Sequence, residues 1–170
     1  MKKSERAENI KKIIHIVVWI TFVFYCLILL KLLFLDMRTQ TSYANILHHI
    51  NLIPFKTIYG YAVKIINDQI NTDIVVRNIL GNLIAFFPMG CYLPCLFPKI
   101  RKFKRVCFVM LGMLVGVELL QLLLRLGSFD IDDIIFNFGG AIVGYGIVCI
   151  PVINGLLKKF FVYRSSETLT

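Results

Sequence analysis

The residues with the most potential for chemistry lie between Glu118 and Asn137, where polar side chains interrupt two apolar runs. Glu118 and Gln121 lie inside the first run, and Arg125 closes it. The second run opens with a group of aspartates, Asp130, Asp132 and Asp133. A charged side chain at membrane depth costs at least about 2.5–3.5 kcal/mol, so such residues face a partner, a cavity or water rather than lipid. The stretch therefore predicts a polar site at the outer end of a small membrane bundle.

The composition is that of an integral membrane protein. The chain has 170 residues, of which 58% are hydrophobic, and a mean hydropathy of +0.75. A soluble domain of this size has no room for several apolar runs of about 20 residues, each long enough to cross a bilayer. The net charge of +9 would indicate nucleic acid in a soluble protein. Here the basic residues flank the apolar runs, as the positive-inside rule and anionic lipids explain, so no nucleic-acid partner is expected.

Hydropathy predicts an all-α fold with a single transmembrane domain over residues 13–153. Its four helices form a small bundle, with spans at about 13–35, 74–97, 106–124 and 134–153. An outer interfacial segment, residues 36–73, joins the first two spans. Basic segments precede and follow the domain, at residues 1–12 and 154–170, and a third basic segment covers residues 98–105. Both termini are therefore expected in the cytoplasm.

Proline and glycine add detail to these spans. Pro88 predicts a kink in the second span, and Pro94 with Pro98 predicts its end. Small residues four apart let helix backbones approach closely, and the third and fourth spans each carry such a pair. The pairs are Gly112-x-x-x-Gly116 and Gly140-x-x-x-Gly144.

In this topology the second, third and fourth spans all carry polar residues in the outer leaflet. Glu118 and Gln121 share one face of the third span, while Asp133 and Asn137 share one face of the fourth, so we expect these faces to point at each other. Arg77 lies in the outer half of the second span, within reach of Glu118. The predicted binding cluster consists of Arg77, Asn78, Asn82, Glu118, Gln121, Asp132, Asp133 and Asn137.

Structural roles for the same residues stay open on the sequence alone. Asp130 is placed to cap the fourth span, and Asp132 and Asp133 are placed to oppose the positive end of its dipole. Arg77 and Glu118 are placed to form a buried pair that fixes helix register. Register needs fewer polar groups than the cluster contains, which favours a binding role for the set as a whole.

Several ordered motifs between about residues 43 and 150 resemble the VanZ-like family of small bacterial membrane proteins. They are N-L-I-P-F at 51–55, R-N-I-L-G-N-L-I-A-F-F-P-M-G at 77–90, E-L-L-Q at 118–121 and D-I-D-D-I-I-F-N-F-G-G-A-I-V-G-Y at 130–145. This resemblance implies a multi-pass protein of the bacterial cell membrane. It also implies a role in low-level resistance to glycopeptide antibiotics, teicoplanin in particular, without remodelling of the peptidoglycan stem terminus.

Two functional classes fit these observations. The first is a non-catalytic protein whose polar site binds a lipid head group, a cell-wall precursor, a lipoglycopeptide or a partner protein at the outer leaflet. No cofactor is expected, and a homo-oligomer is one arrangement that would supply further helices. The second is an enzyme acting on a lipid or polyprenyl phosphate, with a divalent cation held by Glu118, Asp132 and Asp133. The sequence offers no evident pair of nucleophile and base for it, so the non-catalytic class is favoured.

Overall fold

A computed structural model describes residues 2–35 and 49–160 of the chain. Part of the predicted interfacial segment, residues 36–48, and most of the predicted tail, residues 161–170, lie outside the described residues. The described elements, in order, are α1 (Lys2–Leu30), the π-helical η1 (Lys31–Leu35), β1 (Ile50–Asn51), α2 (Lys56–Ile66), α3 (Thr72–Leu96), the 3-10 turn η3 (Pro98–Ile100), α4 (Phe103–Leu123), β2 (Phe129–Asp130), α5 (Ile131–Cys149) and α6 (Pro151–Phe160).

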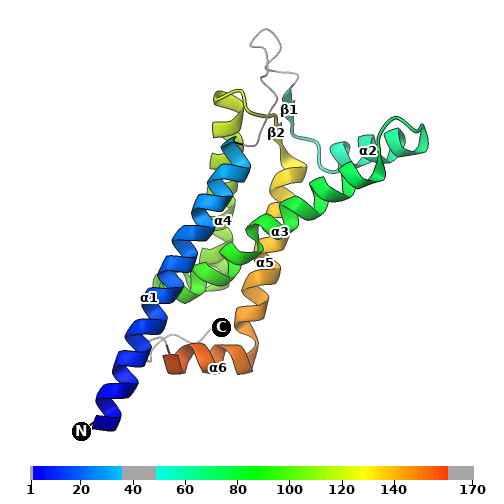
Figure 1. Cartoon of the computed structure of the whole chain (residues 1–170). Helices are drawn as coiled ribbons and strands as arrows, with labels where there is room; N and C mark the ends of the chain where they lie inside the picture. Colours follow the sequence, from blue (N-terminus) through cyan, green and yellow to red (C-terminus); the bar gives the residue numbers. More distant parts are fainter. Residues whose placement is uncertain (1, 36–48, 161–170) are drawn as a thin grey trace.

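The prediction of an all-α protein with four spans is confirmed. In the described part of the chain, four helical segments are long and apolar enough to cross a membrane, and they are Glu5–Leu35, Thr72–Leu96, Phe103–Leu123 and Ile131–Cys149. Figure 1 shows α6 at the end of the bundle where α1 begins, while β1, β2 and α2 lie at the opposite end. We call this opposite end the polar end, because Asp130 to Asp133 lie there.

The fourth span differs from its predicted range, because α5 ends at Cys149 and a separate helix follows. Ile150 adopts an extended conformation, with φ −55° and ψ 128°. The following Pro151 disfavours the helical conformation at Ile150 and lacks the amide that would continue the hydrogen-bond ladder. Apolar residues on both sides of this break made residues 134–153 look like one helix.

Glycine brings α3 and α5 into direct backbone contact. A Cβ atom placed on Gly140 would overlap the carbonyl oxygen of Leu83, and one on Gly144 would overlap that of Phe87. Gly90 of α3 makes the reciprocal contact with Ala141 of α5. The predicted role of the Gly140-x-x-x-Gly144 pair in close packing is therefore confirmed.

The second glycine pair, on α4, packs against nothing within the described residues. No atom lies within 4 Å of a Cβ built on Gly112 or Gly116. The core of α4 is instead its opposite face, where Val106, Met110 and Leu114 are buried. The expectation of a close helix contact at Gly112-x-x-x-Gly116 is not met in the described chain.

Aromatic residues attach α1 to the middle and to the C-terminal end of α3. Trp19 and Phe22 contact Phe97 edge-on, with ring centroids 5.5 and 6.2 Å away. The Tyr25 hydroxyl donates a 2.7 Å hydrogen bond to the backbone carbonyl of Ala85. This carbonyl lies next to that of Ile84, which loses its helical donor to Pro88. Pro88 and Pro94 both remain inside α3, and the helix ends at Leu96 before Pro98.

The segment Lys56–Asn82, which we call the arm, extends sideways from the bundle at the polar end (Figure 1). It consists of α2 and the first part of α3, which lie side by side. Asn78 of α3 donates a 2.6 Å hydrogen bond to the Tyr61 hydroxyl of α2. The side chain of Asn71 caps α3 by accepting from the Asp73 amide at 3.0 Å. The start of α3, which belongs to the arm, leans away from α4 and α5 (Figure 1).

Candidate functional site

A short parallel bridge joins two segments that lie far apart in the sequence. Ile50 pairs with Phe129, and Asn51 pairs with Asp130. The Asn51 side-chain amide also donates to Asp130 Oδ1 at 2.9 Å and to the Thr57 hydroxyl at 3.1 Å. The bridge thereby brings the N-L-I-P-F motif against the start of the D-I-D-D motif.

Asp132 holds the first turn of α2. Its Oδ1 accepts from the backbone amide of Phe55 at 2.5 Å, and its Oδ2 accepts from that of Thr57 at 2.9 Å. The first amides of a helix have no partner inside the helix and are normally satisfied by a capping side chain. Phe55, at the N-cap of α2, provides none and adopts a left-handed conformation with φ 64°. The carboxylate of Asp132 on α5 therefore replaces the missing cap.

Besides Asn51, Asp130 contacts three further neighbours. Its side chain caps α5 by accepting from the Asp132 amide at 2.9 Å, as the structural interpretation of the sequence predicts. Its Oδ2 accepts from the Thr57 hydroxyl at 2.5 Å. Its backbone amide donates to Glu118 Oε2 at 3.2 Å, which connects α4 to the start of α5.

These residues form one hydrogen-bonded group that we call the clasp, made of Asn51, Thr57, Glu118, Asp130 and Asp132. Its three acids are buried: Glu118 is 4% exposed, Asp130 is 7% exposed and Asp132 is 2% exposed. Buried carboxylates are tolerated where donors surround them. The clasp therefore joins α4, α5 and the arm through satisfied polar groups.

A comparison with known protein families identifies the family of this chain. The sequence model of the VanZ/LLP1 family matches residues 22–154, which include the clasp and all four long helices in whole or in part. The chain belongs to the VanZ/LLP1 family. No curated protein and no solved structure matches it. The resemblance carried by the sequence motifs is thereby confirmed.

Three further predicted site residues of this VanZ/LLP1 chain lie at helix contacts near the clasp. The Asn82 amide of α3 donates to Asp133 Oδ1 of α5 at 2.5 Å. Gln121 is 3% exposed and donates to the backbone carbonyl of Leu33 at 3.0 Å, which ties η1 to α4. The face of α5 that carries Asp133 thus meets α3, and the expectation that it points at the Glu118 face of α4 is wrong. The reason is that the glycines further along the same face hold α5 against α3.

Asn137 lies one helical turn deeper than Asp133 on α5. It is 4% exposed, and its Oδ1 atom has no hydrogen-bond partner among the described residues. A buried acceptor without a donor costs about 1–3 kcal/mol. Asn137 is therefore the one predicted site residue with a buried, unused acceptor in the described chain.

Arg77 and Asn78 are not brought to the clasp. Both are exposed on the arm, where Asn78 contacts Tyr61. Arg77 and Glu118 belong to the described part of the chain, and no ion pair joins them. The sequence placed Arg77 in the outer half of the second span, but the first turns of α3 lean out of the bundle (Figure 1).

The three acids of the alternative metal site do not form a ligand set. Within residues 2–35 and 49–160, no group of three or more His, Cys, Asp or Glu side chains is placed to hold a metal ion. Both oxygens of Asp132 point at backbone amides, and Asp133 accepts from Asn82. Hydrogen bonds within the protein thus occupy both oxygens of Asp132 and one oxygen each of Glu118 and Asp133.

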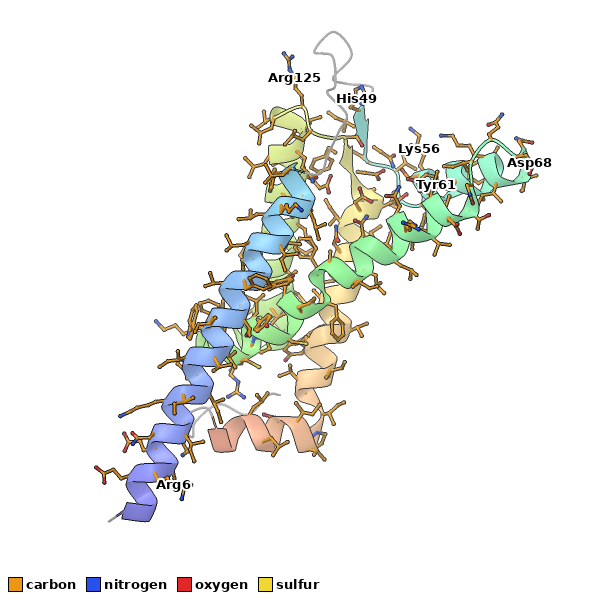
Figure 2. The ribbon with its side chains drawn as sticks, viewed as in Figure 1. Arg6, His49, Lys56, Tyr61, Asp68 and Arg125 are labelled. Carbon is orange, nitrogen blue, oxygen red and sulfur yellow. The ribbon has the colours of Figure 1, made fainter. Side chains whose placement is uncertain are left out.

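A pocket of about 340 Å³ opens beside the clasp. Figure 2 shows His49, Lys56 and Tyr61 at this end of the molecule, and all three line the pocket. Burial raises the pKa of the Tyr61 hydroxyl. The Asn78 hydrogen bond lowers this pKa, and the nearby charges of Asp133 and Asp130 raise it, so Tyr61 is neutral at physiological pH.

Sequence reasoning missed this pocket, as well as Asn51 and Thr57. The N-L-I-P-F motif, which begins at Asn51 and ends two residues before Thr57, was the available signal.

Proposed function

We propose that this VanZ/LLP1 protein contributes to low-level resistance to glycopeptide antibiotics, teicoplanin in particular. It does so without catalysis, through its polar end in the outer leaflet of a bacterial cell membrane. The site binds a lipid head group, a cell-wall precursor or a partner, and so limits the access of a lipid-tailed antibiotic to its target.

One observation carries this proposal, which is that five buried polar residues of α4, β2 and α5 gather at the polar end, and half-buried Asn82 of α3 lies beside them. The five are Glu118, Gln121, Asp130, Asp132 and Asn137. Glu118, Asp130 and Asp132 use their oxygens to hold the arm in place. A set of acids arranged in this way supports a shaped binding surface better than a reaction centre. Membership of the family adds the link to glycopeptides that the sequence motifs imply.

The distribution of basic residues supports the outer leaflet. Lys and Arg are frequent in residues 1–12, 98–105 and 154–170, and sparse in 36–73 and 125–133. The positive-inside rule assigns the frequent group to the cytoplasm. The polar end then faces outward, where a lipid-anchored antibiotic gathers.

Susceptibility of a sensitive Gram-positive host tests the proposal. Teicoplanin and vancomycin are compared in cells with an empty vector, the wild-type chain, Glu118→Gln and Glu5→Gln, with the membrane abundance of each protein quantified. Gln keeps an acceptor for the Asp130 amide while it removes the charge, so Glu118→Gln separates charge from shape. Glu5 is exposed at the other end and is the matched control.

We expect a teicoplanin-selective rise in resistance with the wild type and with Glu5→Gln, and its loss with Glu118→Gln at equal abundance. Wild-type cells as susceptible as the empty host would contradict the proposed resistance. Full resistance with Glu118→Gln would contradict a working role for the charge of Glu118.

A further inference from the structure

The pocket beside the clasp gathers basic and neutral hydrogen-bond donors on one wall. Lys56 and Lys64 both line it, together with His49 and Tyr61. Its volume of about 340 Å³ falls within the range of small-molecule sites. None of these side chains belongs to the buried clasp that holds the arm.

The lysines stand on one face of α2 with a glycine between them. Lys56, Gly60 and Lys64 follow each other at intervals of four residues, and such residues share a helix face. A Cβ built on Gly60 meets no atom within 4 Å, so the wall between the lysines is open. This leaves room for a ligand that both ammonium groups can reach.

Among the described residues that line the pocket, the one carboxylate already accepts hydrogen bonds. Asp130 accepts from the Asn51 amide, the Thr57 hydroxyl and the Asp132 backbone amide. With two lysines and one acid among the described lining residues, the formal charge of the lining is positive. The pocket therefore favours an anion.

The outer surface of α2 points to a lipid as the source of that anion. Tyr59, Val63 and Ile66 are 73%, 36% and 80% exposed, and they follow each other at helical spacing. A helix with one apolar stripe and lysines on another face is typical of the membrane interface, where the stripe meets acyl chains and the lysines meet head groups. In Figure 1, α2 lies beside the start of the span Thr72–Leu96, as such a position requires.

We propose that this pocket binds the phosphate group of an anionic lipid head group, held by Lys56 and Lys64 above the open face at Gly60. This inference deepens the proposed function and rests on it for the choice of leaflet. Ammonium groups bind phosphate through charge-assisted hydrogen bonds, which are the strongest that a side chain offers. The bound head group lies against the clasp, so the geometry of the pocket depends on Asp130 and Asp132.

The experiment uses the purified full chain in a non-ionic detergent and titrates it calorimetrically with three probes. These are dioctanoyl phosphatidylglycerol, dioctanoyl phosphatidylcholine and inorganic phosphate. Lys56→Gln and Lys64→Gln remove one charge each, and Gly60→Leu fills the open wall. The matched controls are Lys104→Gln, exposed at the far end, and Gly155→Leu, which also has no atom within 4 Å of its Cβ position.

We expect saturable binding of phosphatidylglycerol that each lysine variant weakens roughly tenfold, the effect of losing one charge-assisted hydrogen bond. Gly60→Leu abolishes binding, the controls match the wild type, and phosphatidylcholine binds at least about tenfold more weakly. Equal binding by wild type, lysine variants and Gly60→Leu would overturn the site. Inorganic phosphate that binds as tightly as phosphatidylglycerol would overturn the lipid as its source.

The head-group inference and the proposed function can fail independently of each other. Teicoplanin resistance that persists while phosphatidylglycerol fails to bind overturns the head-group inference alone. Phosphatidylglycerol binding that depends on Lys56 and Lys64, in a chain that confers no resistance, supports the inference and overturns the proposed function alone.

Discussion

Asp132 Oδ2 accepts a 2.9 Å hydrogen bond from the backbone amide of Thr57, a residue 75 positions earlier in the chain. The other oxygen of Asp132 accepts from the Phe55 amide. The start of α2 is therefore completed by a side chain of α5. This explains why two polar motifs from distant parts of the sequence act as one unit.

Asp132→Asn is predicted to loosen the arm. Asparagine offers one acceptor oxygen where aspartate offers two, and its amide group would face a backbone donor. Loss of a buried, charge-assisted hydrogen bond lowers the free energy of unfolding by roughly 2–3 kcal/mol. Unfolding in mixed micelles of increasing denaturing detergent measures the change. Asp68→Asn is the control, because Asp68 is exposed and its left-handed conformation suits asparagine; a loss as large in the control would contradict the assignment.

Gly140→Ala is predicted to separate α3 from α5. The added methyl group would overlap the backbone carbonyl of Leu83, which cannot move without its helix. Overpacking of this kind lowers the free energy of unfolding by about 1–3 kcal/mol or more. Gly112→Ala meets no atom and is expected to stabilise the chain by about 0.5–1 kcal/mol, the usual effect of alanine inside a helix. Equal stability of the two variants would show that the backbones do not touch.

Asn137→Leu is predicted to stabilise the protein. Leucine has a similar shape and removes an acceptor that is buried without a partner among the described residues. The free energy of unfolding should rise by about 1 kcal/mol. Should the variant instead lose more than about 2 kcal/mol, Asn137 Oδ1 has a donor in the folded protein.

Topology is testable with single cysteines at the two ends of the molecule. Asp68 lies in the turn after α2, and Lys104 lies near the start of α4 at the far end. Under the proposed orientation, a membrane-impermeant maleimide labels Asp68→Cys in intact cells and labels Lys104→Cys only after lysis. The wild type, whose five cysteines are all partly buried, gives the background. The reverse pattern would place the clasp in the inner leaflet.

Hydropathy predicted the four spans because each helix needs a continuous apolar run to cross a bilayer. The outer-end position of Asn82, Glu118, Asp132 and Asp133 follows from the alternating directions of those spans. These residues do lie at one end of the described structure. Their use as binding residues remains a prediction.

The misplaced residues have physical causes that spacing along one helix does not reveal. The contacts of Gly140 and Gly144 decide that α5 faces α3, and the tilt of α3 then carries Arg77 into the arm. The break at Pro151 had a clear signal in the sequence, but apolar residues on both sides concealed it. The bridge between Asn51 and Asp130 depends on a long-range pairing of two-residue strands, too short to show a period.

The most direct test of the account is the amount of a fluorescent teicoplanin that binds to intact Gram-positive cells. It compares an empty host with cells that hold equal amounts of wild type, Asp132→Asn or Asp68→Asn. If the clasp shapes an outer-leaflet site that limits antibiotic access, wild type and Asp68→Asn lower the bound amount, and Asp132→Asn returns it to the level of the empty host. The same bound amount in all four strains would contradict the account.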